Sequence, residues 1–220
     1  KNKKKLKEIV EHINLIKPDI VVLTGDLMDR HINYQDKDIE VISTYLNSIN
    51  ASMGKYIITG NHDQVSDRYH ELIEKINFTN LNDSYQILYN GDSESIMISG
   101  LSTVTNNIDT KEKLYDINTA LKNEANNIKY NILILHEPDI IDDFEYNNFD
   151  LILAGHSHGG QVRLPFVGAI IVPPYAKKYH DSYYDLGKSD LYISSGLGTS
   201  NLNLRLNNKP SFNLYRLVSK

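Results

Sequence analysis

The sequence contains no cysteine, and this absence excludes disulfides, zinc–thiolate sites and a cysteine nucleophile. It also has no run of about 18 apolar residues, so no transmembrane helix is predicted. The segment from Leu6 to Ile16 mixes polar and apolar residues and does not resemble the apolar core of a signal peptide. No repeat, low-complexity linker or change in composition divides the chain. We therefore predict a single domain over residues 1–220.

The charge balance bears on the kind of partner. The formal net charge is −5 and the pI is near 5.9, which disfavours nucleic acid as a partner. A basic cluster opens the chain at Lys1, Lys3, Lys4, Lys5 and Lys7. It fits the solvated start of a helix, and it also fits contact with an anionic membrane surface. An acidic protein can still bind phosphate where metal ions supply the positive charge.

The spacing of apolar residues predicts the fold class. Helical spacing is found over Leu6–Ile16, Ile39–Ile49, Tyr69–Ile76 and Leu114–Leu121. Strands are predicted over Ile20–Leu23, Tyr56–Thr59, Gln86–Tyr89, Ile96–Ser99, Asn131–Leu135, Leu151–Ala154, Gln161–Leu164, Ala169–Val172, Leu191–Ser194 and Phe212–Leu217. Asn90-Gly91 is a hairpin signal between two of them. The first part is α/β and the end is mostly β, which predicts an α/β fold with a two-sheet β-sandwich flanked by helices.

Four polar residues follow predicted strands directly. Asp26, Asn61, His136 and His156 each come just after the C-terminal end of an apolar run. In open α/β sheets, that edge of the sheet is where ligands bind. Each residue alone has an ordinary explanation, such as a turn, a helix cap or a structural histidine. Four metal-competent side chains at equivalent positions predict a shared site.

The loop Gly155-His156-Ser157-His158-Gly159-Gly160 strengthens this prediction. Its two histidines are two residues apart and lie between glycines, which allow close approach of the backbone to a ligand. Such a loop is typical of a metal site.

The chain resembles the calcineurin-like metallophosphoesterase family in four motifs that occur in the family's order. These are Gly25-Asp26-Leu27-Met28-Asp29, Gly60-Asn61-His62-Asp63, His136 and Gly155-His156-Ser157-His158. The resemblance spans roughly residues 18–217. It implies a four-layer α/β/β/α arrangement and a hydrolase that cleaves phosphoester or pyrophosphate bonds.

The resemblance also implies a binuclear centre with two divalent transition-metal ions. Asp26 would bridge the two ions, Asn61, His136 and His156 would complete one site, and His158 would bind the other ion. Carboxylate, amide and imidazole ligands without sulfur suit Mn, Fe or Zn. Two such ions about 3.5–4 Å apart can acidify a water and clamp a phosphoryl group.

The same resemblance gives catalytic roles to two further residues. His62 is similar to the family histidine that contacts the transferring phosphoryl group or protonates the leaving oxygen. Asp63 would then orient that imidazole. We expect Asp29 to hydrogen-bond a histidine or the loop backbone rather than to bind metal.

One family motif is missing. The family begins with an Asp-x-His pair after its first strand, and residues 1–20 predict one helix and no such pair. Asp29-Arg30-His31 matches the Asp-x-His pattern, but it lies in the loop after the second motif. We expect that the physical protein is longer and that this sequence lacks its first strand. As written, it encodes one full metal position and a fraction of the second.

Motifs in the C-terminal part indicate which branch of the family the sequence resembles. His156 to Pro165, Ser195 to Ser200, and Arg205 resemble the bacterial cell-envelope branch, which includes enzymes similar to UDP-2,3-diacylglucosamine pyrophosphatase. This implies a small phosphorylated substrate, and membrane association through a segment upstream of Lys1. Arg163 and Arg205 are candidate phosphate contacts, because a guanidinium matches phosphate oxygens. They equally fit surface arginines of β-hairpins.

Two other functions remain open. A non-catalytic metal-binding scaffold of the same fold would account for the missing motif, although it would have no use for His62 and Asp63. A nucleic-acid phosphodiesterase would share the chemistry but is disfavoured by the acidic balance. The natural substrate, the metal used in the cell and the oligomeric state do not follow from the sequence.

Overall fold

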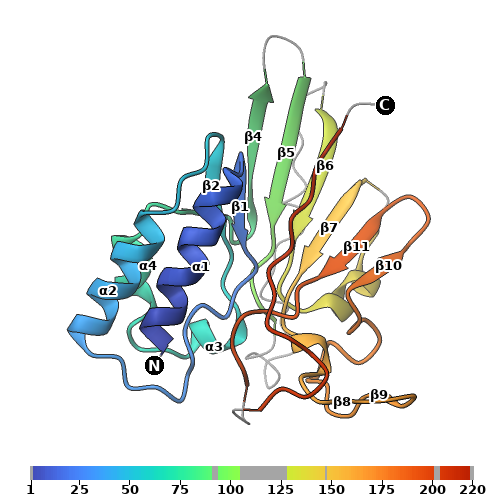
Figure 1. The fold of residues 1–220 in the computed structure, drawn as a ribbon. Helices are drawn as coiled ribbons and strands as arrows, with labels where there is room; N and C mark the ends of the chain where they lie inside the picture. Colours follow the sequence, from blue (N-terminus) through green and yellow to red (C-terminus); the bar gives the residue numbers. More distant parts are fainter. Residues whose placement is uncertain (1, 91–93, 105–127, 147, 201–203, 219–220) are drawn as a thin grey trace.

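The computed structural model describes residues 2–90, 94–104, 128–146, 148–200 and 204–218. The helix predicted over Leu114–Leu121 and the turn after Asn90 lie outside these ranges. The described part forms two main β-sheets and a separate two-stranded hairpin, with three helices packed on the outer face of the smaller sheet (Figure 1). None of the described helices is long and apolar enough to cross a bilayer.

The smaller sheet comes from the N-terminal part and is parallel. Its order is β1-β2-β3, formed by β1 (Ile20–Leu23), β2 (Gly54–Ile57) and β3 (Thr79–Asn80). Helices α1 (Asn2–Ile16), α2 (Asp36–Asn47) and α4 (Tyr69–Lys75) cover its outer face (Figure 1). These helices form where apolar residues recur every three to four positions, so each has one side to bury. Ile39 and Leu72 on that side are fully buried.

The larger sheet has six strands in the order β10-β11-β7-β6-β5-β4. Its strands are β4 (Ser84–Asn90), β5 (Glu94–Gly100), β6 (Ile128–Ile134), β7 (Leu151–Ala154), β10 (Tyr183–Asp185) and β11 (Asp190–Ile193). The strands β5, β6, β7 and β11 are parallel, whereas β4 and β10 pair antiparallel at the two edges. The predicted hairpin of β4 and β5 is confirmed, with Ser84 opposite Gly100.

Three apolar clusters define the layers. One lies between the two sheets and includes Ile58, Ile98 and Ile134. A second lies between the smaller sheet and its helices. A third covers the far face of the larger sheet, where η2 (Pro138–Asp143) packs with Ile141 fully buried. The α/β two-sheet sandwich predicted from the sequence is confirmed.

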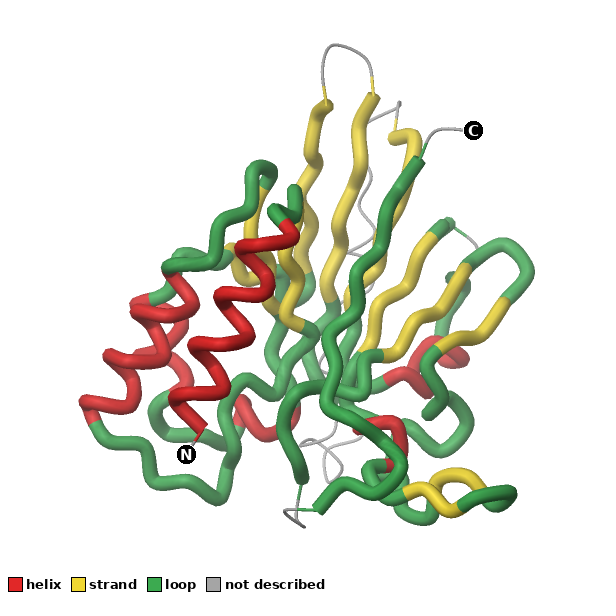
Figure 2. Tube along the Cα trace, in the orientation of Figure 1, coloured by secondary structure: helices red, strands yellow, loops and turns green. Residues whose placement is uncertain are grey.

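The C-terminal third is less regular than predicted. Only β8 (Arg163–Leu164) and β9 (Gly168–Ala169) form in the region of two predicted strands, and they pair as a short hairpin. The strand predicted over Phe212–Leu217 is wrong: this segment is extended chain without a described ladder (Figure 2). Phe212 and Leu214 alternate as in a strand, but both are exposed, and a strand needs a hydrogen-bonded neighbour.

The parallel arrangement fixes where the candidate residues lie. Asp26 follows β1, Asn61 begins the short helix α3 (Asn61–Gln64) after β2, His136 follows β6, and His156 follows β7. The carboxyl ends of these strands face one edge of the sandwich, where the loops of both sheets meet.

Candidate metal centre

The loops after β1 and β2 meet at two glycines. Gly25 has φ +89°, a conformation that favours glycine. A Cβ atom on Gly60 would lie 2.3 Å from both the backbone nitrogen and the Oδ1 of Asp26. Oδ1 of Asp26 also accepts a hydrogen bond of 2.8 Å from the His62 N–H. The two glycines therefore let one loop lie directly on the other and hold Asp26 and Asn61 side by side.

His136 enters this site from β6 with one ring nitrogen already engaged. Its Nδ1 donates to the carbonyl of Thr24 over 2.6 Å. Its Nε2 lies 3.2 Å from Oδ2 of Asp26 and 3.2 Å from Oδ1 of Asn61. The carbonyl fixes the orientation of the imidazole, so Nε2 is the atom presented to a ligand.

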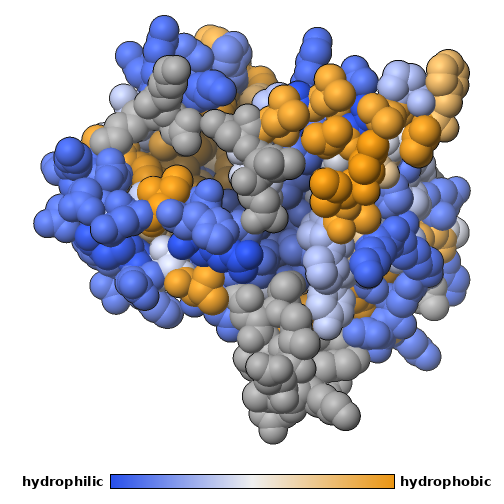
Figure 3. Space-filling view, turned by 90° about the horizontal axis from the view of Figure 1, so that it is seen from below, coloured by the Kyte–Doolittle hydropathy of each residue, from blue (hydrophilic) through white to orange (hydrophobic). Residues whose placement is uncertain are grey.

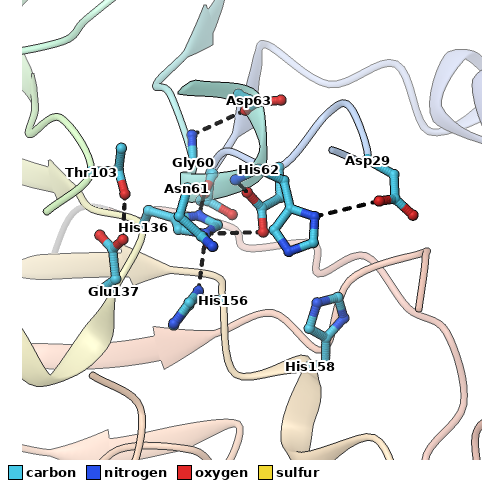
Figure 4. A network of polar contacts seen from close by, with 12 residues as sticks. Asp29, Gly60, Asn61, His62, Asp63, Thr103, His136, Glu137, His156 and His158 are labelled. Carbon is cyan, nitrogen blue, oxygen red and sulfur yellow. Dashed lines mark hydrogen bonds and ion pairs between the residues drawn. The ribbon is translucent and has the colours of Figure 1, made fainter. Parts of the chain in front are cut away.

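His156 presents the opposite ring nitrogen. Its Nε2 donates to the carbonyl of Pro174 over 2.8 Å, and its Nδ1 lies 3.2 Å from Nε2 of His136. The ring centroids are 4.9 Å apart (Figure 4). Both histidines thus have their outer N–H held by backbone carbonyls, and their other nitrogens face the same point.

This donor set fits a metal ion. The carboxylate of Asp26 and the imidazoles of His136 and His156 each offer a ligand atom, and these atoms lie within 4.8 Å of one another. Oδ1 of Asn61 adds a fourth. A metal bonded at about 2.0–2.2 Å spaces neighbouring ligands about 3–3.5 Å apart, which matches the 3.2 Å contacts. The predicted convergence of these four side chains is confirmed.

The charges in the site also favour a cation. Burial alone would raise the pKa of Asp26, but the imidazoles of His136 and His62 hold it well below its usual range. Burial alone would lower the pKa of His136, but the Asp26 carboxylate raises it to about 10. Burial, with His136 beside it, lowers the pKa of His156 to about 4, so His156 is neutral at pH 7. The Asp26 carboxylate thus holds a proton on His136 at the place where a metal ion would bind, and binding of the metal would release this proton.

Three of the candidate ligands have backbones in the left-handed region. The φ angles are +55° at Asp26, +60° at His156 and +49° at His158. Such conformations cost about 1–3 kcal/mol for a residue other than glycine and cluster at functional sites. The surrounding loops maintain them, which is typical of a site that positions side chains at some cost to stability.

The hydrogen bonds of Asp63 differ from those predicted. Asp63 was expected to orient His62, but its two carboxylate oxygens accept the N–H groups of Met28 at 2.8 Å and Gly60 at 3.0 Å. Asp63 is fully buried and ties the β1 loop to the β2 loop. The carboxylate facing His62 belongs to Asp29, with Oδ1 at 3.6 Å from Nδ1 (Figure 4).

His158 lies apart from His136 and His156, on the side of His62 (Figure 4). Its Nδ1 is 3.5 Å from Nη2 of Arg205. Burial, with Arg205 beside it, lowers the pKa of His158 to about 4, so it is neutral at pH 7. The structure does not bring His158 into the group of three ligand atoms, and its assignment to a second ion stays a prediction.

The two candidate arginines differ in their surroundings. Arg163 pairs with Asp181 at 2.7 Å and donates to the Gly159 carbonyl at 3.0 Å, so it braces the histidine loop. Arg205 donates to the carbonyls of Ser195 and Gly196, while its buried Nη1 has no hydrogen-bond partner among the described residues. Arg205 therefore keeps a donor beside His158.

Sequence reasoning missed the groups that orient the histidines. The carbonyls of Thr24 and Pro174 act through the backbone, so no residue type reveals them. Asp29 was expected to hydrogen-bond a histidine or the loop backbone; its Oδ1 accepts the N–H of His31 at 2.9 Å and lies 3.6 Å from His62, which the sequence did not single out as the histidine. Only its position three residues after Asp26 could have indicated it.

Comparisons with known proteins show the family to which the chain is related. The family described as calcineurin-like phosphoesterase matches residues 1–160. The chain is 35% identical over 218 residues to an uncharacterized metallophosphoesterase, YkuE, of Bacillus subtilis, covering 97% of this chain and 73% of that protein. It is 27% identical over 219 residues to the phosphodiesterase YaeI of Escherichia coli, covering 92% and 71%. Against several other curated relatives, the chain spans about half their length.

Among solved structures, the NAD nucleotidase NadN of Haemophilus influenzae is similar in fold. The TM-score is 0.55 at 18% sequence identity, covering 87% of this chain and 39% of that one. At this identity the likeness concerns the fold alone.

Proposed function

Because this chain belongs to the calcineurin-like phosphoesterase family, whose members use divalent metal ions, we propose that it hydrolyses a phosphoester or pyrophosphate bond with a metal-activated water. The observation that carries the proposal is the cluster of Asp26, His136 and His156, whose ligand atoms lie within 4.8 Å. A hydrogen bond to a backbone carbonyl orients each of the two imidazoles. Membership of this family favours an enzyme over a non-catalytic scaffold.

Asp26, Asn61, His136 and His156 would hold one ion, with Mn, Fe or Zn as the expected metals. When bound, the metal supplies Lewis acidity and lowers the pKa of a coordinated water. The two-ion arrangement is part of the proposal, with Asp26 as the bridge and His158 on the second ion. Support comes from the neutral state of His158 and from its place on the His62 side of the site.

His62 is proposed to contact the phosphoryl group or to protonate the leaving oxygen. Its backbone N–H is fixed on Asp26, which keeps the ring next to the metal ligands. Asp29 would orient the imidazole from 3.6 Å. Arg205 would contact a substrate phosphate through its guanidinium, which matches phosphate oxygens and whose Nη1 has no hydrogen-bond partner among the described residues.

The substrate is proposed to be a small phosphorylated molecule that is linked to a nucleotide or belongs to the cell envelope. The resemblance of the C-terminal motifs to the bacterial envelope branch supports this, and YkuE and YaeI are bacterial. Location at the membrane or envelope belongs to the same proposal. The net charge of −5 supports a small substrate over nucleic acid.

The test is hydrolysis of a chromogenic phosphodiester by the chelator-treated protein, before and after addition of Mn²⁺, Fe²⁺ or Zn²⁺. We expect activity that returns with metal in the wild type and that is lost in His156→Ala. Arg205→Lys should raise KM while metal content stays unchanged, because the guanidinium fork is lost but the charge remains. Metal-independent hydrolysis, or an unaffected His156→Ala variant, would refute the proposal. Tight metal binding without turnover on any phosphodiester, monoester or pyrophosphate would favour the scaffold.

A further inference from the structure

The β8–β9 hairpin exposes a group of large apolar side chains to solvent. The exposed residues on and beside it are Leu164, Phe166, Val167, Ile170 and Ile171. Phe166, at the turn, is 108% exposed, so its ring contacts almost nothing in the protein. The view onto this side shows apolar surface gathered over the hairpin (Figure 3). Clustered apolar side chains of this size on a soluble domain mark an interaction surface.

The base of the hairpin is held by the C-terminal segment and packs on the histidine loop. The N–H of Ile170 donates to the carbonyl of Val162 at 3.1 Å, and the N–H of Arg163 donates to the carbonyl of Leu206 at 3.0 Å. A Cβ on Gly160 would lie 2.2 Å from Cβ of Ala169, so the hairpin base lies directly on this glycine. The apolar tip is therefore presented on a braced support.

The segment that carries the tip has basic residues and no acidic ones of its own. Between Gly155 and His180 it contains Arg163, Lys177 and Lys178. No acidic residue occurs between Gly155 and His180. Arg163 and Lys178 are partly neutralised by Asp181 and Asp142, whereas Lys177 is exposed beside them. An apolar tip whose own segment carries basic residues and no acidic residue is complementary to an anionic lipid surface.

We propose that the β8–β9 hairpin inserts Phe166 and its apolar neighbours into an anionic bilayer surface. The loop that follows the hairpin carries Pro174, whose carbonyl orients His156, and β8 begins five residues after His158. Docking through the tip thus places the metal centre next to the layer of phosphate headgroups. Binding to lipid is measured without turnover, so the proposal stands or falls separately from the proposed hydrolysis.

The sequence provides a clean probe, because it contains no tryptophan. Phe166→Trp introduces a single indole at the tip. With vesicles of phosphatidylglycerol and phosphatidylethanolamine, its emission should shift to the blue and be quenched by brominated acyl chains. Leu15→Trp is the matched control, since Leu15 is 78% exposed on α1, away from the hairpin (Figure 1). Equal quenching of both variants, or of neither, would overturn the proposal.

A second measurement uses loss of binding. In vesicle co-sedimentation, the triple variant Phe166→Ser, Val167→Ser and Ile171→Ser should bind at least about tenfold more weakly, because each buried side chain of this kind is worth roughly that factor. Leu15→Ser should bind as the wild type does. Vesicles of phosphatidylcholine alone should bind the wild type weakly.

Two results of this measurement would point to another occupant and overturn the proposal. Undiminished binding of the triple variant would assign the contact to the lysines of α1. A wild-type dimer that dissociates in the triple variant, without lipid binding, would assign the surface to a second copy of the chain.

Discussion

The substitution Gly60→Ala should damage the metal centre without removing a ligand. An added Cβ would lie 2.3 Å from both the nitrogen and the Oδ1 of Asp26, and 2.8 Å from Cε1 of His136. Ordinary contact begins at 3.4 Å, so the loops must separate by about 1 Å, whereas ligand distances tolerate only about 0.2 Å. We expect metal affinity to fall by at least about 10–100-fold, as when groups supporting a ligand are lost.

The assay is calorimetric titration of the chelator-treated protein with Zn²⁺ or Mn²⁺, with circular dichroism to verify folding. Gly198→Ala is the matched control, because a Cβ on Gly198 meets nothing within 4 Å. This control should bind metal as the wild type does, with stability unchanged or slightly raised. If folded Gly60→Ala binds metal with wild-type affinity, the close approach of the two loops does not define the site. Equal losses of affinity in both variants would refute the reasoning as well.

Three further outcomes are expected. His62→Ala should slow turnover by about 10²–10⁴-fold with metal content retained, because His62 is assigned to proton transfer or phosphoryl contact; loss of metal would show it to be a ligand. Asp63→Ala should lower the free energy of unfolding by about 2–4 kcal/mol in urea denaturation, because the buried N–H groups of Met28 and Gly60 lose their acceptor; a variant as stable as the wild type would contradict this. Metal at 100 times its Kd should stabilise the fold by about 2.7 kcal/mol over the chelated protein, and the resulting rise in Tm should be absent from His156→Ala; an equal rise in that variant would place the ion elsewhere.

The sequence alone predicts those helices and strands whose buried side can be recognised from the spacing of nearby apolar residues. The apolar spacing of Leu6 to Ile16 predicts α1, and the β-branched run Ile20–Leu23 predicts β1. Asp26 and His156 could be located because parallel strands place their carboxyl ends at one edge. The convergence of the four candidate ligands follows from this rule without knowledge of any distance.

Features that depend on distant partners were not predictable. Phe212 to Leu217 has the alternation of a strand, but a ladder depends on which backbone lies beside it. The family resemblance assigned Asp63 to His62, and Asp29 was expected to bond a histidine or the loop backbone. The structure separates them because the buried Asp63 is used by backbone N–H groups of two loops. Carbonyl groups such as that of Pro174 carry no sequence signal at all.

The left-handed backbones of Asp26, His156 and His158 bear on the choice of inactive variants for trapping a bound substrate. Alanine at these positions would change the chemistry and the backbone preference together, and a β-branched residue would be strongly disfavoured. Asparagine is among the few residues that adopt this conformation readily. Asp26→Asn and His156→Asn therefore remove a charge or an imidazole while leaving the loop its preferred shape. A trapped complex of such a variant would report on a site whose loops keep their shape.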